Sequence, residues 1–504
     1  YIFASWREPR PLGRGGSTSG LRMARIAFVQ NLAFEYLGLM FISSVLKQNG
    51  HNVEVFIGNN LRKIVDNVKT YGPEIVGFPC ITGNHQWCLT ASKAIKAKTK
   101  ALTVFGGPHP TFFPEIIREP QVDIICRGEA EIAFLKLVNM FENKGDITKV
   151  SNCWFKSDGQ IIENDLSLLI EDLDGLPFPD RDLYYKKYPF LNRSQKVFIA
   201  GRGCPFKCSY CFNNSLRTLY SGKGKYIRYR SVDNVLAEIK SVYKKYGMQT
   251  VYMVDDTFIL NIPWLYDFLD RYKKEVNLPL ICLIRVDLLN EDIVKRLKEA
   301  NCYSVFFGIE SGNEGLRKQI LSKNISDEQI VNASSLLKKY RIRFRTYNML
   351  GIPGETINDA LQTVKINIKI RTDYPWCSIL QPYPKTGIEE YARSNNLIDP
   401  DIISIPSSFF CSSVINLKYK NQLTNLQKLF TAPNDDSVES ISNVLSQNAF
   451  LDLTDAAGNT FLHGTVSTSE KAANSYKLAA KLVGYGATIK QNKTGQSPVD
   501  LWCN

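Results

Sequence analysis

The sequence predicts an α/β protein built from two parallel-sheet domains in tandem. Strand and helix patterns alternate regularly from Arg25 and do so again from about residue 191. Such alternation is typical of parallel sheets whose strands are joined through helices. A hairpin pattern and a proline-rich stretch, residues 151–190, separate the two series. The first series predicts a doubly wound sheet, and the second predicts a partial barrel of βα units.

The length and composition of the chain indicate what general class of protein it is. The chain has 504 residues, enough for two to four domains, and its 44% hydrophobic and 22% charged content is ordinary for a soluble globular protein. No apolar run approaches the roughly 20 residues that span a bilayer, so we expect no membrane segment. The twelve cysteines are thinly spread apart from one cluster, which favours a reducing, cytoplasmic location over a disulfide framework.

The net charge of +13 fits a phosphate-bearing cofactor or an acidic substrate. The basic residues are scattered rather than gathered in a patch, so nucleic-acid binding is disfavoured. Residues 1–23 are expected to form a disordered leader, with Met23 as the natural start.

The first domain is expected at residues 24–150. Its apolar strand patterns and amphipathic helix patterns alternate, with the helices ending at turn residues. The strands are predicted at 26–29, 53–57, 74–78, 101–105 and 122–125, and the helices at 36–48, 61–69 and 87–98.

Parallel sheets bind ligands at the carboxyl ends of their strands. Glycine-rich turns follow the third and fourth expected strands, and a charged turn follows the fifth. These turns supply the candidate binding residues Thr82, Gly83, His85, Gly106, Gly107, His109 and Glu129. Their types indicate a nucleotide-like or flavin-like cofactor, although His109 is equally explained as a locally bonded turn residue.

The second domain is expected at residues 191–430. Its strands are predicted at 197–200, 251–254, 280–284, 304–309, 343–350 and 376–380, with helices between them, and Ser231 is expected to cap the helix that runs through Lys245. In βα barrels the chemistry gathers at the carboxyl ends of the strands. At those ends the sequence places Cys204, Cys208, Cys211, Asp255, Asp256, Arg285, Glu310, Ser311 and Gly351.

The three cysteines follow a short apolar strand with the spacing Cys-x3-Cys-x2-Cys. Soft thiolates at such spacing suit zinc or an iron–sulfur cluster. Structural zinc takes four protein ligands, and no fourth Cys or His lies within ten residues of the triplet. A [4Fe-4S] cluster held by three thiolates keeps one iron open. Zinc, or three buried structural thiols, is the alternative.

The cysteine spacing, Tyr210 before the last cysteine and the Gly-Cys-Pro lead-in resemble the cluster loop of the radical SAM superfamily. The resemblance implies that Cys204, Cys208 and Cys211 bind a [4Fe-4S] cluster whose open iron chelates S-adenosylmethionine (SAM). It also implies a core of (βα)6 type. The residues that it assigns to SAM are Tyr210, Phe212, Asp255, Asp256, Glu310, Ser311 and Gly351. The alternative for each acidic residue is a cap on the following helix.

The first domain resembles the Rossmann-like cobalamin-binding domain that precedes many radical SAM cores. The resemblance rests on the apolar third strand, the turn at 106–111 and the Arg-Gly-Glu-x-Glu run from Arg127. It implies that a corrin lies across these strand ends. The Asp-x-His-x-x-Gly motif that supplies a histidine to cobalt is absent, so a base-off cofactor without a protein imidazole is expected. His85 stays open as an alternative ligand.

Residues 431–504 change in character. Gly458-Asn-Thr-Phe-Leu and Gly495-Gln-Ser-Pro-Val stand some 37 residues apart, and with the helix-friendly stretch between them they resemble ankyrin repeats. One complete unit with fragments seldom stands alone. Protein binding is the function that this all-α segment suggests.

Taken together, these resemblances predict a cobalamin-dependent radical SAM enzyme. Its expected reaction is methylation of an unactivated carbon or a phosphinate of a small molecule, with flavodoxin or ferredoxin as the electron donor. Three alternatives remain: a corrin-dependent rearrangement or oxidation, a radical SAM enzyme that modifies tRNA, and an ankyrin-type scaffold with an inactive enzyme body. The sequence does not specify the substrate.

Overall fold

The computed structural model describes residues 23–157, 159–399, 405, 413–418, 420, 423–424 and 426–427. The expected leader, apart from Met23, and the ankyrin-like segment lie outside these residues. The chain divides into two compact units. Within the described residues, unit 1 comprises residues 23–194 with Leu216–Met248, and unit 2 comprises Gln195–Ser215 with the residues from Gln249 onward.

Unit 1 contains a seven-stranded sheet in the order β2-β1-β3-β4-β5-β6-β7. Its strands are β1 (Arg25–Gln30), β2 (Asn52–Ile57), β3 (Ile75–Pro79), β4 (Leu102–Gly106), β5 (Ile124–Cys126), β6 (Cys153–Ser157) and β7 (Gln160–Glu163). β1 to β5 are parallel, so the predicted parallel sheet is confirmed. The predicted hairpin is confirmed as β6 and β7, and it extends the sheet because β6 pairs antiparallel with β5.

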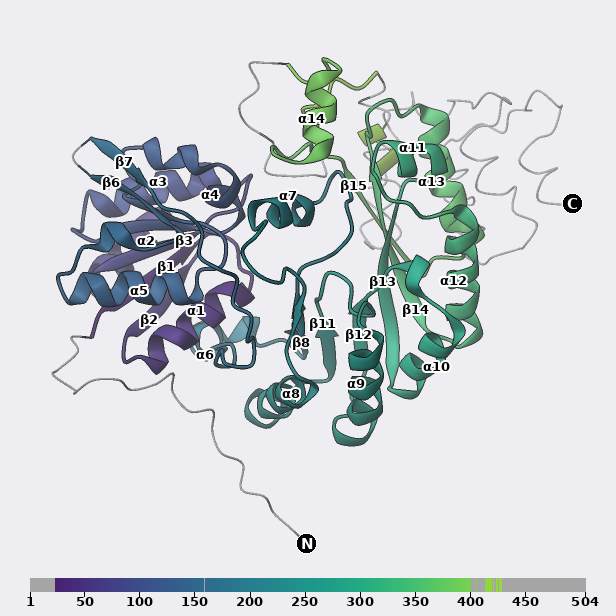
Figure 1. The fold of residues 1–504 in the computed structure, drawn as a ribbon, viewed down its shortest axis with the longest axis horizontal. Helices are drawn as coiled ribbons and strands as arrows, with labels where there is room; N and C mark the ends of the chain where they lie inside the picture. The colour runs from purple at the N-terminus through teal and green to yellow at the C-terminus, as the bar shows by residue number, and fades with distance from the viewer. Residues whose placement is uncertain are drawn as a thin grey trace, which may run out of the picture. The chain divides into compact units, whose positions relative to one another are not determined.

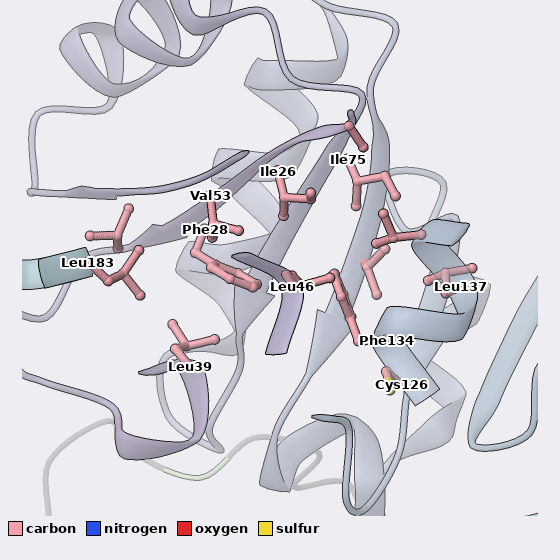
Figure 2. Close-up of a cluster of buried hydrophobic side chains, with 14 of the residues drawn as sticks. Ile26, Phe28, Leu39, Leu46, Val53, Ile75, Cys126, Phe134, Leu137 and Leu183 are labelled. Carbon is pink, nitrogen blue, oxygen red and sulfur yellow. The ribbon is translucent and has the colours of Figure 1, made fainter. Parts of the chain in front are cut away.

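Helices cover both faces of this sheet. The helices of unit 1 are α1 (Leu37–Gln48), α2 (Leu61–Tyr71), α3 (His85–Lys96), α4 (Pro108–Phe112), α5 (Glu131–Glu142), α6 (Asp182–Tyr185) and α8 (Val232–Tyr246). Side chains alternate along β1: Ile26 and Phe28 pack with α1 and α5, whereas Ala27 and Val29 pack with α2 and α3. Figure 2 shows the first of these cores, where Phe28 and Phe134 contact each other.

Buried ion pairs fix the chain that follows the sheet of unit 1. Arg181 and Arg230 both contact the Glu238 carboxylate of α8, with side chains that are at least 96% buried. Asp182 binds Lys245 and Tyr246 at the end of α8. The predicted cap of α8 is confirmed, because the Ser231 hydroxyl accepts a hydrogen bond from the Asn234 N–H. These contacts join α8 to the segment that follows the sheet of unit 1.

Unit 2 contains six parallel strands in the order β15-β14-β13-β12-β11-β8. The strands are β8 (Gln195–Phe198), β11 (Thr250–Met253), β12 (Leu280–Leu283), β13 (Cys302–Glu310), β14 (Arg343–Leu350) and β15 (Tyr374–Ile379). Each strand therefore pairs with the strand of this sheet that comes next along the chain, as a sheet built from successive βα units requires.

The helices of unit 2 are α9 (Ile262–Glu275), α10 (Glu291–Glu299), α11 (Glu314–Gln319), α12 (Asp327–Lys339), α13 (Ile357–Lys369) and α14 (Gly387–Ser394). α10 packs on β13, and α12 and α13 pack on β14 (Figure 1). Capping boxes begin α12 at Ser326 and α13 at Thr356, which fixes where these helices start.

The remaining elements are short, apart from α7 (Phe212–Leu219), which runs from unit 2 into unit 1. They are β9 (Gly201–Arg202), β10 (Arg228–Tyr229), and 3-10 turns at Pro114–Arg118, Ile147–Lys149, Pro189–Leu191 and Val286–Leu288. Among the described residues, none of the helices combines the length and the apolar character that crossing a bilayer requires.

Candidate functional site

The three-cysteine loop lies at the carboxyl end of β8, as predicted, and it is anchored on both sides. At its start, the Asp255 carboxylate accepts hydrogen bonds from the N–H groups of Ala200 (3.0 Å) and Gly201 (2.6 Å). In its middle, Ser209 donates through its N–H to the Leu321 carbonyl and through its hydroxyl to the Ile320 carbonyl. The backbone of the loop is therefore fixed by unit 2 itself.

Burial raises the pKa of the Cys204 thiol, and it raises the pKa of the Cys211 thiol to about 11. Both thiols are thus protonated at neutral pH, and metal binding would release protons. Among the described residues, no three His, Cys, Asp or Glu side chains converge as one metal ion would require. Three soft thiolates in one loop are a donor set that suits a four-iron cluster, in which each thiolate binds a different iron.

The two aspartates after β11 have different roles. Asp255 is 4% exposed, its oxygens accept the backbone N–H groups of the loop, and burial raises its pKa to about 7. Asp256 is exposed and hydrogen-bonds Asn213. Asp255 therefore positions the loop, whereas Asp256 keeps a carboxylate at the edge of the sheet.

Glu310 ends β13 and joins the cysteine loop to the sheet. Its Oε1 accepts hydrogen bonds from the Tyr210 hydroxyl (3.0 Å) and from Lys323 Nζ (2.8 Å). All three groups face inward, and burial together with the Glu310 charge raises the pKa of Tyr210. A Cβ on Gly308 would lie 1.8 Å from Glu310 Oε1 and 2.6 Å from Lys323 Nζ, so only glycine fits beside this ion pair.

Ser311 and Gly351 lie at the ends of neighbouring strands. Ser311 is fully buried, and its hydroxyl accepts a hydrogen bond from the Asn313 N–H. Gly351 has a φ of 82°, which favours glycine, and its N–H donates to Glu355 Oε2 at 2.5 Å. Burial raises the pKa of Glu355 to about 8, and its Oε1 is buried without a hydrogen-bond partner among the described residues. The Phe212 ring lies 5.6 Å from that of Tyr383, which follows β15.

In unit 1 the order β2-β1-β3 places the carboxyl ends of β1 and β3 side by side. The chain leaves these two strands in opposite directions across the sheet, and ligands bind at such a switch point. Thr82, Gly83 and His85 follow β3, and Gly107 and His109 follow β4. The structure thus brings together the residues that the sequence placed in separate turns.

Three aromatic rings form a stack at this edge. His85 and His109 are parallel with centroids 4.2 Å apart, and Phe113 lies 4.7 Å from His109. His109 Nδ1 is 3.1 Å from the Thr82 hydroxyl, and His85 Nδ1 is 3.3 Å from the Gly83 nitrogen. Burial lowers the pKa of both imidazoles, to about 3 for His109, where His85 adds to the effect. The stack is therefore uncharged at neutral pH.

The two glycines at the end of β4, Gly106 and Gly107, differ in the room that they leave for a side chain. Gly107 has a φ of 100°, and a Cβ there would lie 3.0 Å from the Cys80 carbonyl oxygen. The nearest atom to a Cβ on Gly106 is the Cys126 oxygen at 3.8 Å, so position 106 has room. Gly107 is thus the residue that lets the backbone turn closely at this edge.

Glu129 has a structural role in unit 1. Both of its carboxylate oxygens bind the Arg228 guanidinium, at 2.7 and 3.0 Å, and one also accepts the Ile170 N–H. Its own N–H donates to the Tyr220 hydroxyl. The ion pair occupies the carboxylate, so the structure provides no argument for Glu129 as a ligand-binding group.

Sequence reasoning did not select four polar residues at the two edges, and it marked a fifth, Arg285, only by its place at a strand end. Asn31 Oδ1 and Asn84 Nδ2 are buried near the ends of β1 and β3 without a hydrogen-bond partner among the described residues. Lys323 and Glu355 complete the edge of unit 2, and Arg285 lies beside the cysteine loop. Each of these residues lies in a turn, and none belongs to a sequence motif with a characteristic spacing. Arg285 was marked by its strand end alone, and no local signal marked the other four.

Comparison with known proteins gives matches over both units. The B12 binding domain family matches residues 31–138, and the Radical SAM superfamily matches residues 198–366. An uncharacterized methyltransferase of Pyrococcus horikoshii is 32% identical over 374 residues, covering 72% of this chain and 79% of the relative.

Two further matches span much of the chain. An anaerobic magnesium-protoporphyrin IX monomethyl ester cyclase of Synechocystis is 28% identical over 380 residues, which are 72% of this chain and 74% of the relative. Among solved structures, the cobalamin-dependent S-adenosylmethionine radical enzyme OxsB with aqua-cobalamin and S-adenosylmethionine bound matches with a TM-score of 0.69 and 15% identity. That match covers 95% of this chain and 78% of OxsB.

Proposed function

The chain belongs to the cobalamin-dependent family of radical SAM methyltransferases, and from this premise we propose that it methylates an unactivated carbon or a phosphinate of a small molecule. Its cofactors are a [4Fe-4S] cluster, SAM and cobalamin. When bound, the cluster and SAM supply a 5′-deoxyadenosyl radical, and the cobalamin supplies the methyl group. The protein must hold these groups in place and exclude water.

The observation that carries the proposal is the edge of the unit 2 sheet, where three thiols stand beside an array of charged side chains. We assign the cluster to Cys204, Cys208 and Cys211, which leaves one iron open. Asp256 supplies an anionic acceptor for the ammonium group of SAM, since charge-assisted hydrogen bonds suit that group. Asp255 acts indirectly, because its carboxylate binds the backbone at the start of the loop.

The remaining SAM contacts are assigned around Glu310, whose position is set by Tyr210 and Lys323. Ser311 and Gly351 provide the polar strand end and the tight turn beside it. Glu355 Oε1, which has no hydrogen-bond partner among the described residues, supports this choice, because a buried polar atom without a hydrogen bond is costly unless a ligand supplies one. Phe212 adds an apolar wall with Tyr383.

Cobalamin is assigned to the switch point of unit 1. The corrin is a large ring with neutral amide side chains, and the imidazole stack and the two asparagine amides at the switch point are neutral as well. The flat imidazole stack and the Gly107 turn admit a ring, and Asn31 Oδ1 and Asn84 Nδ2 offer one acceptor and one donor to amides. Thr82, Gly83 and Gly106 complete the proposed set.

His85 is a poor cobalt ligand in this arrangement. Its Nδ1 accepts the Gly83 N–H, so the proton of the neutral ring is on Nε2, and that nitrogen is a donor. We therefore propose a base-off corrin without a protein imidazole.

A second function is supported by the cyclase relative from Synechocystis, whose name describes ring formation rather than methyl transfer. In this alternative the same cofactors carry out a radical oxidation. For either reaction we propose a low-potential electron donor such as flavodoxin or ferredoxin. We also propose a cytoplasmic location, in keeping with the free thiols of the cysteines in the described residues.

Anaerobic reconstitution with iron and sulfide, with and without hydroxocobalamin, tests the proposal. We expect about four irons per chain and retained corrin, followed by demethylation of SAM once substrate is present. Iron without corrin would eliminate methylcobalamin chemistry. Zinc in place of iron would overturn the assignment of the cysteine loop.

A further inference from the structure

Arg285 follows β12 and is held against the cysteine loop at two points. Its guanidinium carbon lies 3.5 Å from the centroid of the Phe206 ring, and its Nη1 lies 3.8 Å from the sulfur of Cys208. Both contacted residues belong to the Cys-x3-Cys segment. Arg285 is 8% exposed, so these contacts form in a largely water-excluded environment.

Asp287 fixes the orientation of this guanidinium. Its two carboxylate oxygens accept hydrogen bonds from Arg285 Nε (3.1 Å) and Nη2 (3.0 Å). Because the guanidinium is planar, this bidentate pair and the stacking on Phe206 determine where Nη1 points. Nη1 is thus aimed at the sulfur before any metal binds.

We propose that Arg285 is a positioning residue that raises the reduction potential of the cluster by donating a hydrogen bond to the Cys208 thiolate. The proposal rests on the proposed function, because it requires the cluster on Cys208. Reduction adds one electron from the external donor to the cluster and increases the negative charge on its sulfur ligands. Hydrogen bonds to these sulfurs therefore favour the reduced form.

Each substitution should shift the reduction potential in a direction that the loss of a merely structural contact would not produce. Replacing Arg285 by methionine removes the donor, so reduction becomes harder. Replacing Asp287 by asparagine removes a negative charge near the cluster, so reduction becomes easier. The two partners of one ion pair should therefore shift the potential in opposite directions.

The experiment is a mediated redox titration of the reconstituted full-length protein, followed by the visible and electron paramagnetic resonance spectra. We expect Arg285→Met to lower the equilibrium constant for one-electron reduction about tenfold, which is about 59 mV more negative. Arg285→Lys should give a smaller negative shift, and Asp287→Asn a shift to less negative potential. In each variant the dissociation constant for SAM should change by a smaller factor than the equilibrium constant for reduction of the cluster.

Arg345→Met is the matched control. Its guanidinium carbon also lies over a phenyl ring, that of Phe306 at 4.6 Å, but no described contact joins it to the cysteine loop. We expect its potential to equal that of the wild type.

The outcomes separate this inference from the proposed function. A wild-type protein that takes up no iron overturns both. Four irons with an unchanged potential in Arg285→Lys and Asp287→Asn overturn the inference alone, and so does a loss of SAM affinity at constant potential. If Arg285→Met fails to retain iron, the shift in reduction potential of Asp287→Asn decides between the outcomes. A shift to less negative potential supports the inference, and a shift in the opposite direction overturns it.

Discussion

The carboxyl edges of the two parallel sheets differ in charge. In unit 1 the switch point beside β1 and β3 presents neutral groups: stacked imidazoles, a glycine turn and two amide atoms that have no hydrogen-bond partner among the described residues. In unit 2 it presents thiols and ionic groups, among them the pairs Arg285–Asp287 and Glu310–Lys323. Under the proposed assignment, the same sheet geometry serves two ligands of different chemistry, one a neutral ring and the other a charged amino acid derivative beside a cluster.

The largest expected effect is on the thiols of unit 2. The triple substitution Cys204→Ala, Cys208→Ala, Cys211→Ala should abolish iron binding after reconstitution, because it removes all three thiols of the loop to which the cluster is assigned. Corrin retention should persist, since unit 1 has its own edge. Iron analysis and the visible spectrum check both statements. Cys126→Ala, a buried strand position in unit 1, should keep its iron; if it also loses iron, the loop assignment is wrong.

The ion pair of unit 2 is the next test. Lys323→Met leaves Glu310 buried without its cation, and breaking a buried pair in this way typically costs about 3–5 kcal/mol. We expect a loss of stability of this size in urea unfolding, together with weaker SAM binding. Adding Glu310→Gln should recover part of the stability.

Lys318→Met is its control, because the Lys318–Glu314 pair is exposed on α11. Such pairs contribute about 0.5 kcal/mol or less. Equal losses in Lys318→Met and Lys323→Met would mean that burial of the pair has no importance.

The glycine turn tests the edge of unit 1. Gly107→Ala places a Cβ against the Cys80 carbonyl at positive φ, a strain of about 1–3 kcal/mol. Retention of hydroxocobalamin on gel filtration should fall, whereas iron content should not. Gly106→Ala, which has room for its Cβ, should retain the corrin. Equal retention by both variants would remove Gly107 from the binding site.

The smallest effect is a difference in pH dependence. His109 has a folded pKa of about 3, below its unfolded value of about 6.5, so the unfolded state takes up the proton first as the pH falls. The free energy of unfolding should then decrease by up to about 1.4 kcal/mol per pH unit below 6.5. Asp255 has a folded pKa of about 7, above its unfolded value, so its contribution is lost as the pH rises from about 4 to 7.

Urea unfolding at pH 5, 6 and 7 checks the two signs. His109→Phe keeps a ring in the stack and should reduce the loss of stability on acidification. Asp255→Asn keeps an acceptor for the loop and should reduce the loss on going from pH 5 to 7. Slopes that match the wild type in both variants would contradict the assignment.

Local patterns were enough to predict the class of fold and the elements that carry the site. The alternation of strands and helices, the hairpin and the cap at Ser231 are confirmed because each depends on residues within one or two turns of the chain. The cysteine spacing likewise identified the loop. The structure includes further details that the patterns did not contain, such as the short helix α4 in the turn after β4.

Local patterns in the sequence were sufficient to predict the two sheets, the thiol loop and the polar residues at the strand ends. The tertiary structure was needed to show which of those residues are occupied by contacts within the chain. Asp255 binds backbone and Glu129 binds Arg228, although both looked like ligand-binding acids, and Lys323 and Asn84 joined the edges without a motif. The physical reason is that hydrogen-bond partners of buried groups come from distant segments, and strand order and packing bring those segments together.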